Sequence, residues 1–177
     1  MYKKKFGRMT VGAWLNWEME QTKPFLMLFV GAMLTGVGFL VRFSVGSPYE
    51  RMPMLALCEH LPPLWLLGLL WSAALFTVGC AGGFVLGYRE RGIAAEKYKG
   101  GMLFLLLSAL ELLWYAVFFG GGLLFASALL AVGILCASVV TTVCFARVSK
   151  FAGMILAFHD VWLAYMVVLN FLVLFSC

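Results

Sequence analysis

Five long apolar stretches dominate this sequence and constrain its fold more than any other feature. They cover residues 24–45, 62–88, 101–119, 122–146 and 151–177. A helix needs about 20 apolar residues to cross the roughly 30 Å hydrocarbon core of a bilayer, and each stretch is about that long. Transmembrane strands would instead show short segments of alternating polarity. The sequence therefore predicts an all-α integral membrane protein, a bundle of five transmembrane helices.

Charged residues are too few to cover a water-facing surface. They make up 12% of the 177 residues, and apolar types make up 64%. A soluble domain has about 25% charged residues. This composition excludes a soluble enzyme, a disordered tail and a nucleic-acid-binding domain, so the lipid bilayer is the first expected partner and no nucleic acid is expected.

The segment 1–23 precedes the first apolar stretch and is expected to lie outside the membrane core. Its lysines are not followed directly by an apolar run, which argues against a cleaved signal peptide. Trp14 and Trp17, close to Glu18, favour a short interfacial helix, and a partly ordered tail anchored by the aromatic rings is the alternative. Residues 24–177 are expected to form one transmembrane domain.

The basic residues predict the orientation of the chain. With five spans, eleven of the thirteen fall on the side of the N-terminus, and only Arg42 and Arg51 fall on the other. Cytoplasmic loops carry the excess of Lys and Arg, so the N-terminus is expected in the cytoplasm and the C-terminus outside. The net charge of +5 then reflects topology rather than an acidic partner. We expect a bacterial cytoplasmic (inner) membrane.

Cysteine and histidine give no sign of a metal site or a disulfide framework. The five cysteines are odd in number and form no CxxC motif, and the two histidines have no zinc-ligand spacing. The sequence also lacks a glycine-rich phosphate loop and a GxSxG motif. A conventional hydrolase or ATPase is therefore not expected.

Ionisable residues inside the apolar stretches are the strongest candidates for function, because they are costly in lipid unless they face the bundle interior. Glu111 shares a helix face with Trp114, Tyr115 and Phe118, at spacings of three, four and seven residues. Such a face predicts an aromatic pocket that contains a few polar groups. Interhelical hydrogen bonds that only hold the bundle together are the alternative.

The last stretch carries a second such face. His159, Trp162, Met166 and Asn170 recur close to helical spacing, with Asp160 beside them. This face, too, indicates either an aromatic pocket with a few polar groups or interhelical hydrogen bonds that only hold the bundle together. Separately, two overlapping GxxxG steps in the second stretch predict close helix packing, within the molecule or across a dimer.

Three motifs in register resemble the translocator protein / tryptophan-rich sensory protein (TspO/MBR) family. The first is Pro62-Pro63-Leu64-Trp65 with Trp71 six residues on, and the second runs from Glu111 through Trp114 to Phe118-Phe119. The third is Trp162 followed by Leu169-Asn170. The resemblance covers roughly residues 24–177, and it identifies the chain as a divergent member.

Several positions depart from the family pattern. Glu111 stands where the family has Asn, Tyr115-Ala116 replaces Ser/Thr-Pro, and Phe158-His159 replaces Pro-Tyr. The family's first-loop signature is mostly replaced, with only Leu55 retained. Because that loop helps to close the ligand pocket in the family, the resemblance leaves the identity of the ligand open.

The resemblance implies a five-helix bundle, often a homodimer, that binds tetrapyrroles such as porphyrin or haem as ligands and requires no cofactor. The implied ligand-binding residues are Trp65, Trp71, Glu111, Trp114, Tyr115, Phe118, Phe119, His159, Trp162 and Asn170. His159 is of a type that can ligate haem iron, although a lone buried histidine is more often a hydrogen-bonded structural residue. No other metal site is expected.

Three functions follow as hypotheses. The first is a membrane-embedded binding protein, sensor or carrier for tetrapyrrole-like hydrophobic ligands. The second is an enzyme that degrades porphyrin with light and oxygen, for which the resemblance implies Trp71 and Trp162 as catalytic residues. The third is a small proton-coupled transporter using Glu111 and His159, although the internal repeat and broken helices typical of transporters are missing.

Overall fold

The fold of the chain was analysed in a computed structural model, which describes residues 10–46, 62–89 and 93–176. These residues form helices and their short connections, with no strand among them. The first-loop residues Arg51, Leu55 and His60 lie outside the described residues, as do the basic residues before Thr10.

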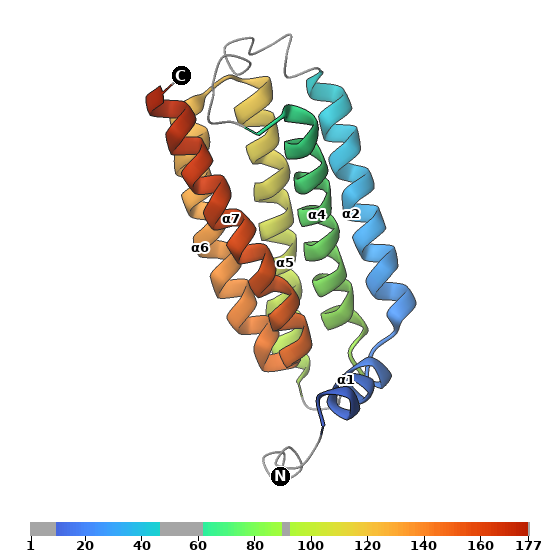
Figure 1. Ribbon diagram of the computed structural model, residues 1–177. Coiled ribbons are helices and arrows are strands. Elements are labelled where there is room, and N and C mark those ends of the chain that lie inside the picture. The colour runs from blue at the N-terminus through green and yellow to red at the C-terminus, as the bar shows by residue number, and fades with distance from the viewer. Residues whose placement is uncertain (1–9, 47–61, 90–92, 177) are drawn as a thin grey trace.

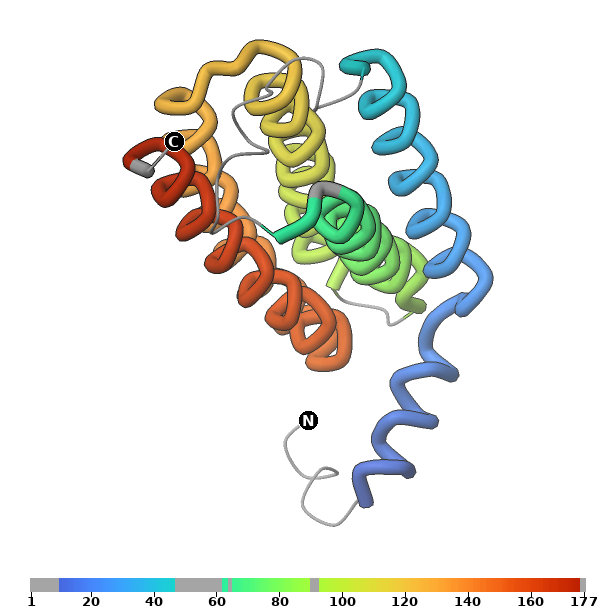
Figure 2. The backbone as a smooth tube through the Cα atoms, turned by 45° about the horizontal axis from the view of Figure 1, so that its top comes forward, coloured from blue at the N-terminus to red at the C-terminus, as the bar shows by residue number. Residues whose placement is uncertain are grey.

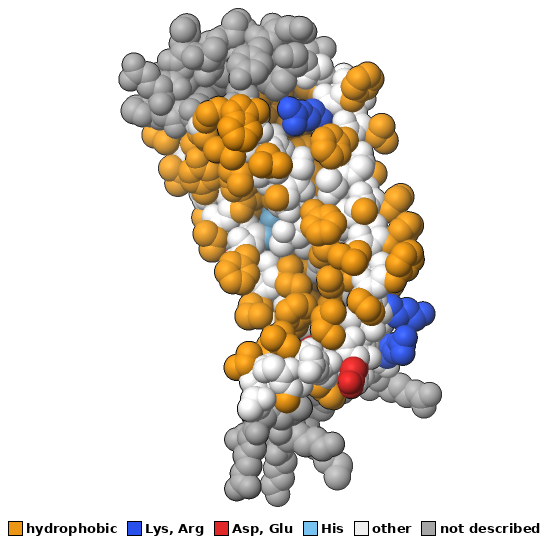
Figure 3. Space-filling view, turned by 45° about the vertical axis from the view of Figure 1, so that its right-hand side comes forward, with side chains coloured by type: hydrophobic (Ala, Val, Ile, Leu, Met, Phe, Trp, Pro, Cys, Tyr) orange, Lys and Arg blue, Asp and Glu red, His pale blue; other side chains and the backbone are white. Residues whose placement is uncertain are grey.

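Five helices are long and apolar enough to cross a membrane, which confirms the predicted number of spans. In chain order they are α2 (Pro24–Val45), α4 (Leu64–Gly87), α5 (Ala94–Tyr115) continued by the π-helix η3 (Ala116–Gly120), α6 (Leu124–Val148) and α7 (Lys150–Ser176). A shorter helix, α1 (Val11–Glu20), precedes them. Large apolar side chains also cover the outside of the bundle, as Figure 3 shows for one face. An apolar surface of this extent is typical of a protein embedded in lipid.

The helices associate in two tightly packed pairs. Helix α2 packs mainly on α4, and α6 packs mainly on α7. Figure 1 and Figure 2 show α4 and α5 between α2 on one side and the α6–α7 pair on the other. Helix α7 also packs on α4, so α4, α5, α6 and α7 surround the centre of the bundle.

Glycines bring α2 and α4 close together. A methyl group added at Gly79 would lie 2.6 Å from the Cα of Gly31, and one at Gly83 would lie 2.7 Å from a carbonyl oxygen of α2. Neither contact could be relieved by moving a side chain. The GxxxG steps of α4 therefore serve packing within the molecule, and a homodimer would have to use another face.

The third span begins earlier than its hydropathy indicates. The apolar stretch starts at Gly101, but α5 starts at Ala94 and includes Glu96, Lys97 and Lys99. Lys97 donates a hydrogen bond of 2.6 Å to the carbonyl oxygen of Tyr88, at the end of α4. Hydropathy locates the apolar part of a helix, and here the helix continues beyond it into a charged first turn that is tied to the end of α4.

The third span also ends in a π-helix that the sequence does not predict. Gly121 N–H bonds the carbonyl oxygen of Ala116, five residues back. Gly122 then adopts a φ of 62°, a left-handed conformation that favours glycine, and α6 begins at Leu124. The glycines at positions 120–122 therefore form the tight turn between these spans, with one wide helical turn before it.

The predicted helix in the N-terminal segment is present as α1, which lies at the end of the bundle where α2 begins (Figure 1). Its Glu18 is only 3% exposed and accepts a 2.7 Å hydrogen bond from the hydroxyl of Ser149. Trp14 contacts Phe151 edge to face, with ring centroids 6.4 Å apart. Ser149 is the single residue between α6 and α7, so α1 is fixed to the junction of these helices.

Candidate functional site

A small cavity lies at the centre of the bundle, between α4, α5, α6 and α7. Its volume is about 20 Å³, enough for about one water-sized group. Apolar and aromatic side chains form most of its wall, with a single polar pair among them. The lining residues are Trp71, Ala74, Glu111, Trp114, Ala131, Ile134, His159, Trp162, Leu163 and Met166.

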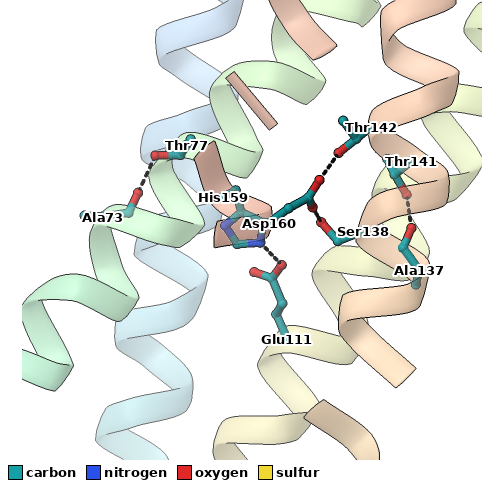
Figure 4. A network of polar contacts seen from close by, with 9 residues as sticks. All are labelled: Ala73, Thr77, Glu111, Ala137, Ser138, Thr141, Thr142, His159 and Asp160. Atoms are coloured by element: carbon teal, nitrogen blue, oxygen red, sulfur yellow. Dashed lines mark hydrogen bonds and ion pairs between the residues drawn. The ribbon is translucent and has the colours of Figure 1, made fainter. Parts of the chain in front are cut away.

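The polar pair consists of Glu111 on α5 and His159 on α7. Their atoms Oε1 and Nε2 are 2.7 Å apart, a distance typical of a charge-assisted hydrogen bond (Figure 4). Glu111 is 4% exposed and His159 is 2% exposed. Each residue therefore provides the partner that the other needs inside a membrane.

The second ring nitrogen of His159, Nδ1, is buried and has no hydrogen-bond partner among the described residues. This is unusual, because most buried polar atoms are paired. Ser108 Oγ on α5 is the other such atom in the described part of the chain, but Ser108 does not line the cavity. His159 therefore contributes one buried, unpartnered polar atom in a ring that lines the cavity.

Coordination of haem iron by His159 would need a free ring nitrogen. The outer ring nitrogen, Nε2, is already bonded to Glu111. The described residues also contain no group of three or more metal-binding side chains.

An aromatic layer adjoins the cavity where α5 passes into η3. The ring centroids of Trp71 and Tyr115 are 4.4 Å apart, and those of Trp114 and Phe118 are 5.2 Å apart in a stacked arrangement. Phe119 contacts both Tyr115 and Phe118. All five side chains are buried, and Tyr115, Phe118 and Phe119 thus stand directly behind the cavity wall.

Asn170 has a structural role in this arrangement. Its Oδ1 accepts a 3.2 Å hydrogen bond from the indole Nε1 of Trp114, and its Nδ2 donates to the carbonyl oxygen of Met166 at 2.7 Å. Both ends of the amide are occupied. Asn170 therefore holds the indole ring of Trp114 in place and does not itself line the cavity.

Asp160, next to His159 in sequence, belongs to a separate polar cluster. Its two carboxylate oxygens accept hydrogen bonds from the hydroxyls of Ser138 and of Thr142, the latter at 2.8 Å (Figure 4). Both donors belong to α6, so the cluster ties α6 to α7. The neighbouring hydroxyl of Thr141 bonds only its own helix, at the carbonyl oxygen of Ala137.

Half of the ten predicted site residues line the cavity: Trp71, Glu111, Trp114, His159 and Trp162. Tyr115, Phe118, Phe119 and Asn170 are buried beside it without lining it. Trp65, in contrast, is 65% exposed on the outside of the bundle. The sequence interpretation had not named Ala74, Ala131, Ile134 and Leu163 as lining residues. These are ordinary apolar residues in apolar helices, and nothing in the sequence distinguishes them.

The fold and the cavity define a class: a protein with five apolar helices long enough to span a membrane and a small aromatic cavity at its centre. The profile of the TspO/MBR family matches residues 25–175, nearly the whole chain. The chain therefore belongs to the TspO/MBR family, and this membership points to ligand binding or sensing in the membrane. It matches no curated protein and no solved structure.

Proposed function

We propose that this protein is a binding protein, acting as a sensor or carrier, for flat hydrophobic ligands of the tetrapyrrole class. The observation that carries the proposal is the aromatic cavity with a single polar pair, inside a bundle of a ligand-binding family. Tryptophan rings from two facing helices, Trp71 and Trp162, supply stacking surface. Pockets for organic ligands are typically apolar with a few polar groups, as here.

Binding requires the cavity to open. Ligand pockets usually measure about 300–1,000 Å³, far more than the 20 Å³ present. The glycine contacts hold α2 to α4, and the Asp160 cluster holds α6 to α7. The cavity lies between these two pairs, so we expect α7 to move away from α4 while each pair stays intact.

The proposal is tested by titrating the purified protein in detergent with protoporphyrin IX and following tryptophan fluorescence. We expect saturable quenching, with affinity about tenfold lower for Trp71→Ala or Trp162→Ala, because a stacking contact is lost. Trp65→Ala is the matched control, because Trp65 belongs to the same helix as Trp71 but lies outside the cavity. Quenching that does not saturate, or that falls equally in all three variants, would refute the proposal.

Light-dependent degradation of the bound porphyrin is a second candidate. It is favoured by the position of Trp71 and Trp162 in one cavity, where both rings could contact the same ligand. Illumination in the presence of oxygen should then bleach the porphyrin Soret band faster with the wild-type protein than with Trp71→Phe/Trp162→Phe. Equal rates would leave binding as the function.

We also propose a bacterial inner-membrane location with the N-terminus in the cytoplasm. Lys23, Arg89, Lys97, Arg147 and Lys150 all lie at or next to the helix ends on the side of α1. A cytoplasmic surface of this charge follows the usual bias of membrane proteins. A reporter fused to the C-terminus should be active only outside the cytoplasm.

A further inference from the structure

The unpartnered Nδ1 of His159 leads to a specific statement about the ligand. Nδ1 belongs to a fully buried ring that lines the cavity, while the other nitrogen of that ring is bonded to Glu111. Whether Nδ1 donates or accepts a hydrogen bond depends on where the protons of the pair reside. The environment of the pair decides between the arrangements.

The pair has a net charge of −1 if Glu111 is ionised and His159 is neutral, and Nδ1 then carries a lone pair. The pair is neutral overall if an ionised Glu111 faces an imidazolium, or if a protonated Glu111 faces a neutral imidazole. In both of these neutral arrangements Nδ1 carries a hydrogen. Among the described residues, no Lys or Arg lines the cavity to balance a net negative charge. A buried net charge is costly, and the neutral arrangements, in which Nδ1–H is a donor, avoid that cost.

We propose that His159 determines ligand specificity by donating a hydrogen bond from Nδ1–H to a carbonyl or carboxyl oxygen at the edge of the ligand. Glu111 acts as a positioning residue that fixes the ring and keeps the proton on Nδ1. This inference rests on the proposed function and narrows it, from flat hydrophobic molecules in general to those with an oxygen acceptor at the edge. A buried donor without a partner disfavours ligands that lack such an oxygen.

Three porphyrins that differ in the oxygen atoms at the ring edge test this proposed hydrogen bond. Protoporphyrin IX has two carboxylic acids, its dimethyl ester keeps the carbonyl oxygens without the charge, and etioporphyrin has only alkyl substituents. Each is titrated against the wild-type protein and variants, and affinities are compared as variant-to-wild-type ratios for one ligand at a time. Differences in solubility between the porphyrins then cancel.

Two variants distinguish the two nitrogens of the ring. The amide nitrogen of asparagine can occupy about the position of His Nδ1, and that of glutamine about the position of Nε2. Both are made with Glu111→Gln, so that no carboxylate is left buried without its partner. Glu111→Gln/His159→Asn should bind protoporphyrin IX and its ester within about threefold of the wild type. Glu111→Gln/His159→Gln should bind both about tenfold more weakly.

Etioporphyrin should bind both double variants alike. Ser108→Ala is the control, because it removes the other unpartnered buried atom, which is outside the cavity, and should change no ratio. Thermal unfolding without ligand confirms that each variant is folded.

The outcomes separate this inference from the proposed function. Equal losses for etioporphyrin and for the oxygen-bearing porphyrins, or equal losses in the Asn and Gln variants, overturn the role of Nδ1 while porphyrin binding stands. Loss with the free acid but not with the ester would show that charge rather than an oxygen acceptor is recognised, and would also overturn it. Failure of all three porphyrins to bind the wild-type protein would overturn the proposed function together with this inference.

Discussion

Among the described residues, two carboxylates lie inside the apolar stretches of the membrane-spanning helices, Glu111 and Asp160, and their surroundings differ. Asp160 receives a hydroxyl donor on each of its oxygens, both from the neighbouring helix α6. Glu111 is bonded to His159, a cavity-lining residue whose other ring nitrogen has no partner in the described part of the chain. The two arrangements are neighbours in the sequence, because His159 directly precedes Asp160.

The difference shows what separates a structural polar group from a functional one in lipid. Both carboxylates are costly to bury and both have partners. Each carboxylate oxygen of Asp160 has a hydroxyl donor from α6. In the Glu111–His159 pair, Nδ1 has no partner among the described residues, and the proposed ligand would supply one. The proposed site therefore rests on an unpartnered polar atom rather than on the presence of a charge.

The largest effect is expected when both donors to Asp160 are removed. Ser138→Ala with Thr142→Val leaves the carboxylate without its partners inside the membrane, and should lower the free energy of unfolding by about 3 kcal/mol. Equilibrium unfolding in mixed micelles measures this change. Adding Asp160→Leu to the same background should restore most of the stability, because it removes the unpartnered charge. A loss below about 0.5 kcal/mol would show that Asp160 is not structural.

A smaller loss is expected from Asn170→Leu. This substitution removes the acceptor for the buried indole N–H of Trp114 and should cost about 1.5 kcal/mol. The same unfolding measurement applies. Since both ends of the Asn170 amide are occupied within the protein, the affinity for protoporphyrin IX should change less than twofold. A stronger effect on affinity than on stability would assign Asn170 to the ligand.

The smallest effect is expected at another carboxylate, the buried Glu18 at the end of the bundle. Ser149→Ala removes a hydrogen bond to Glu18 and the cap that Ser149 Oγ provides to Ala152 N–H at the start of α7. A loss of about 1 kcal/mol is expected. Ser149→Thr keeps the hydroxyl and should be close to the wild type. An equal loss of stability in both variants would indicate that the hydrogen bonds of the Ser149 hydroxyl do not stabilise the fold.

Hydropathy predicted the spans, because twenty apolar residues in a row have few other structures available. It could not predict η3, since the change to a π-helix depends on hydrogen bonds of the backbone. Helical periodicity placed Glu111 and His159 each on an aromatic face, but their contact depends on how α5 and α7 are rotated about their axes. That rotation is set by packing around the whole bundle, as are the positions of Ala131 and Ile134 in the cavity wall.

The two tryptophans of α4 show the limit of a motif. Trp65 and Trp71 belong to one sequence motif, yet six residues at about 100° each place them about 120° apart around the helix. One is therefore 6% exposed in the cavity wall and the other is 65% exposed on the outside. The motif identifies the family, whereas the helix geometry decides which of its tryptophans can reach a ligand.

The most direct test of the contrast between the two carboxylates is the dissociation constant of protoporphyrin IX for two variants measured side by side. Glu111→Gln/His159→Phe removes the donor at the cavity wall, and Asp160→Asn changes only the cluster between α6 and α7. The account predicts binding about tenfold weaker than the wild type for the first, by the loss of one hydrogen bond, and within about twofold for the second. Equal effects, or a larger loss for Asp160→Asn, would contradict it.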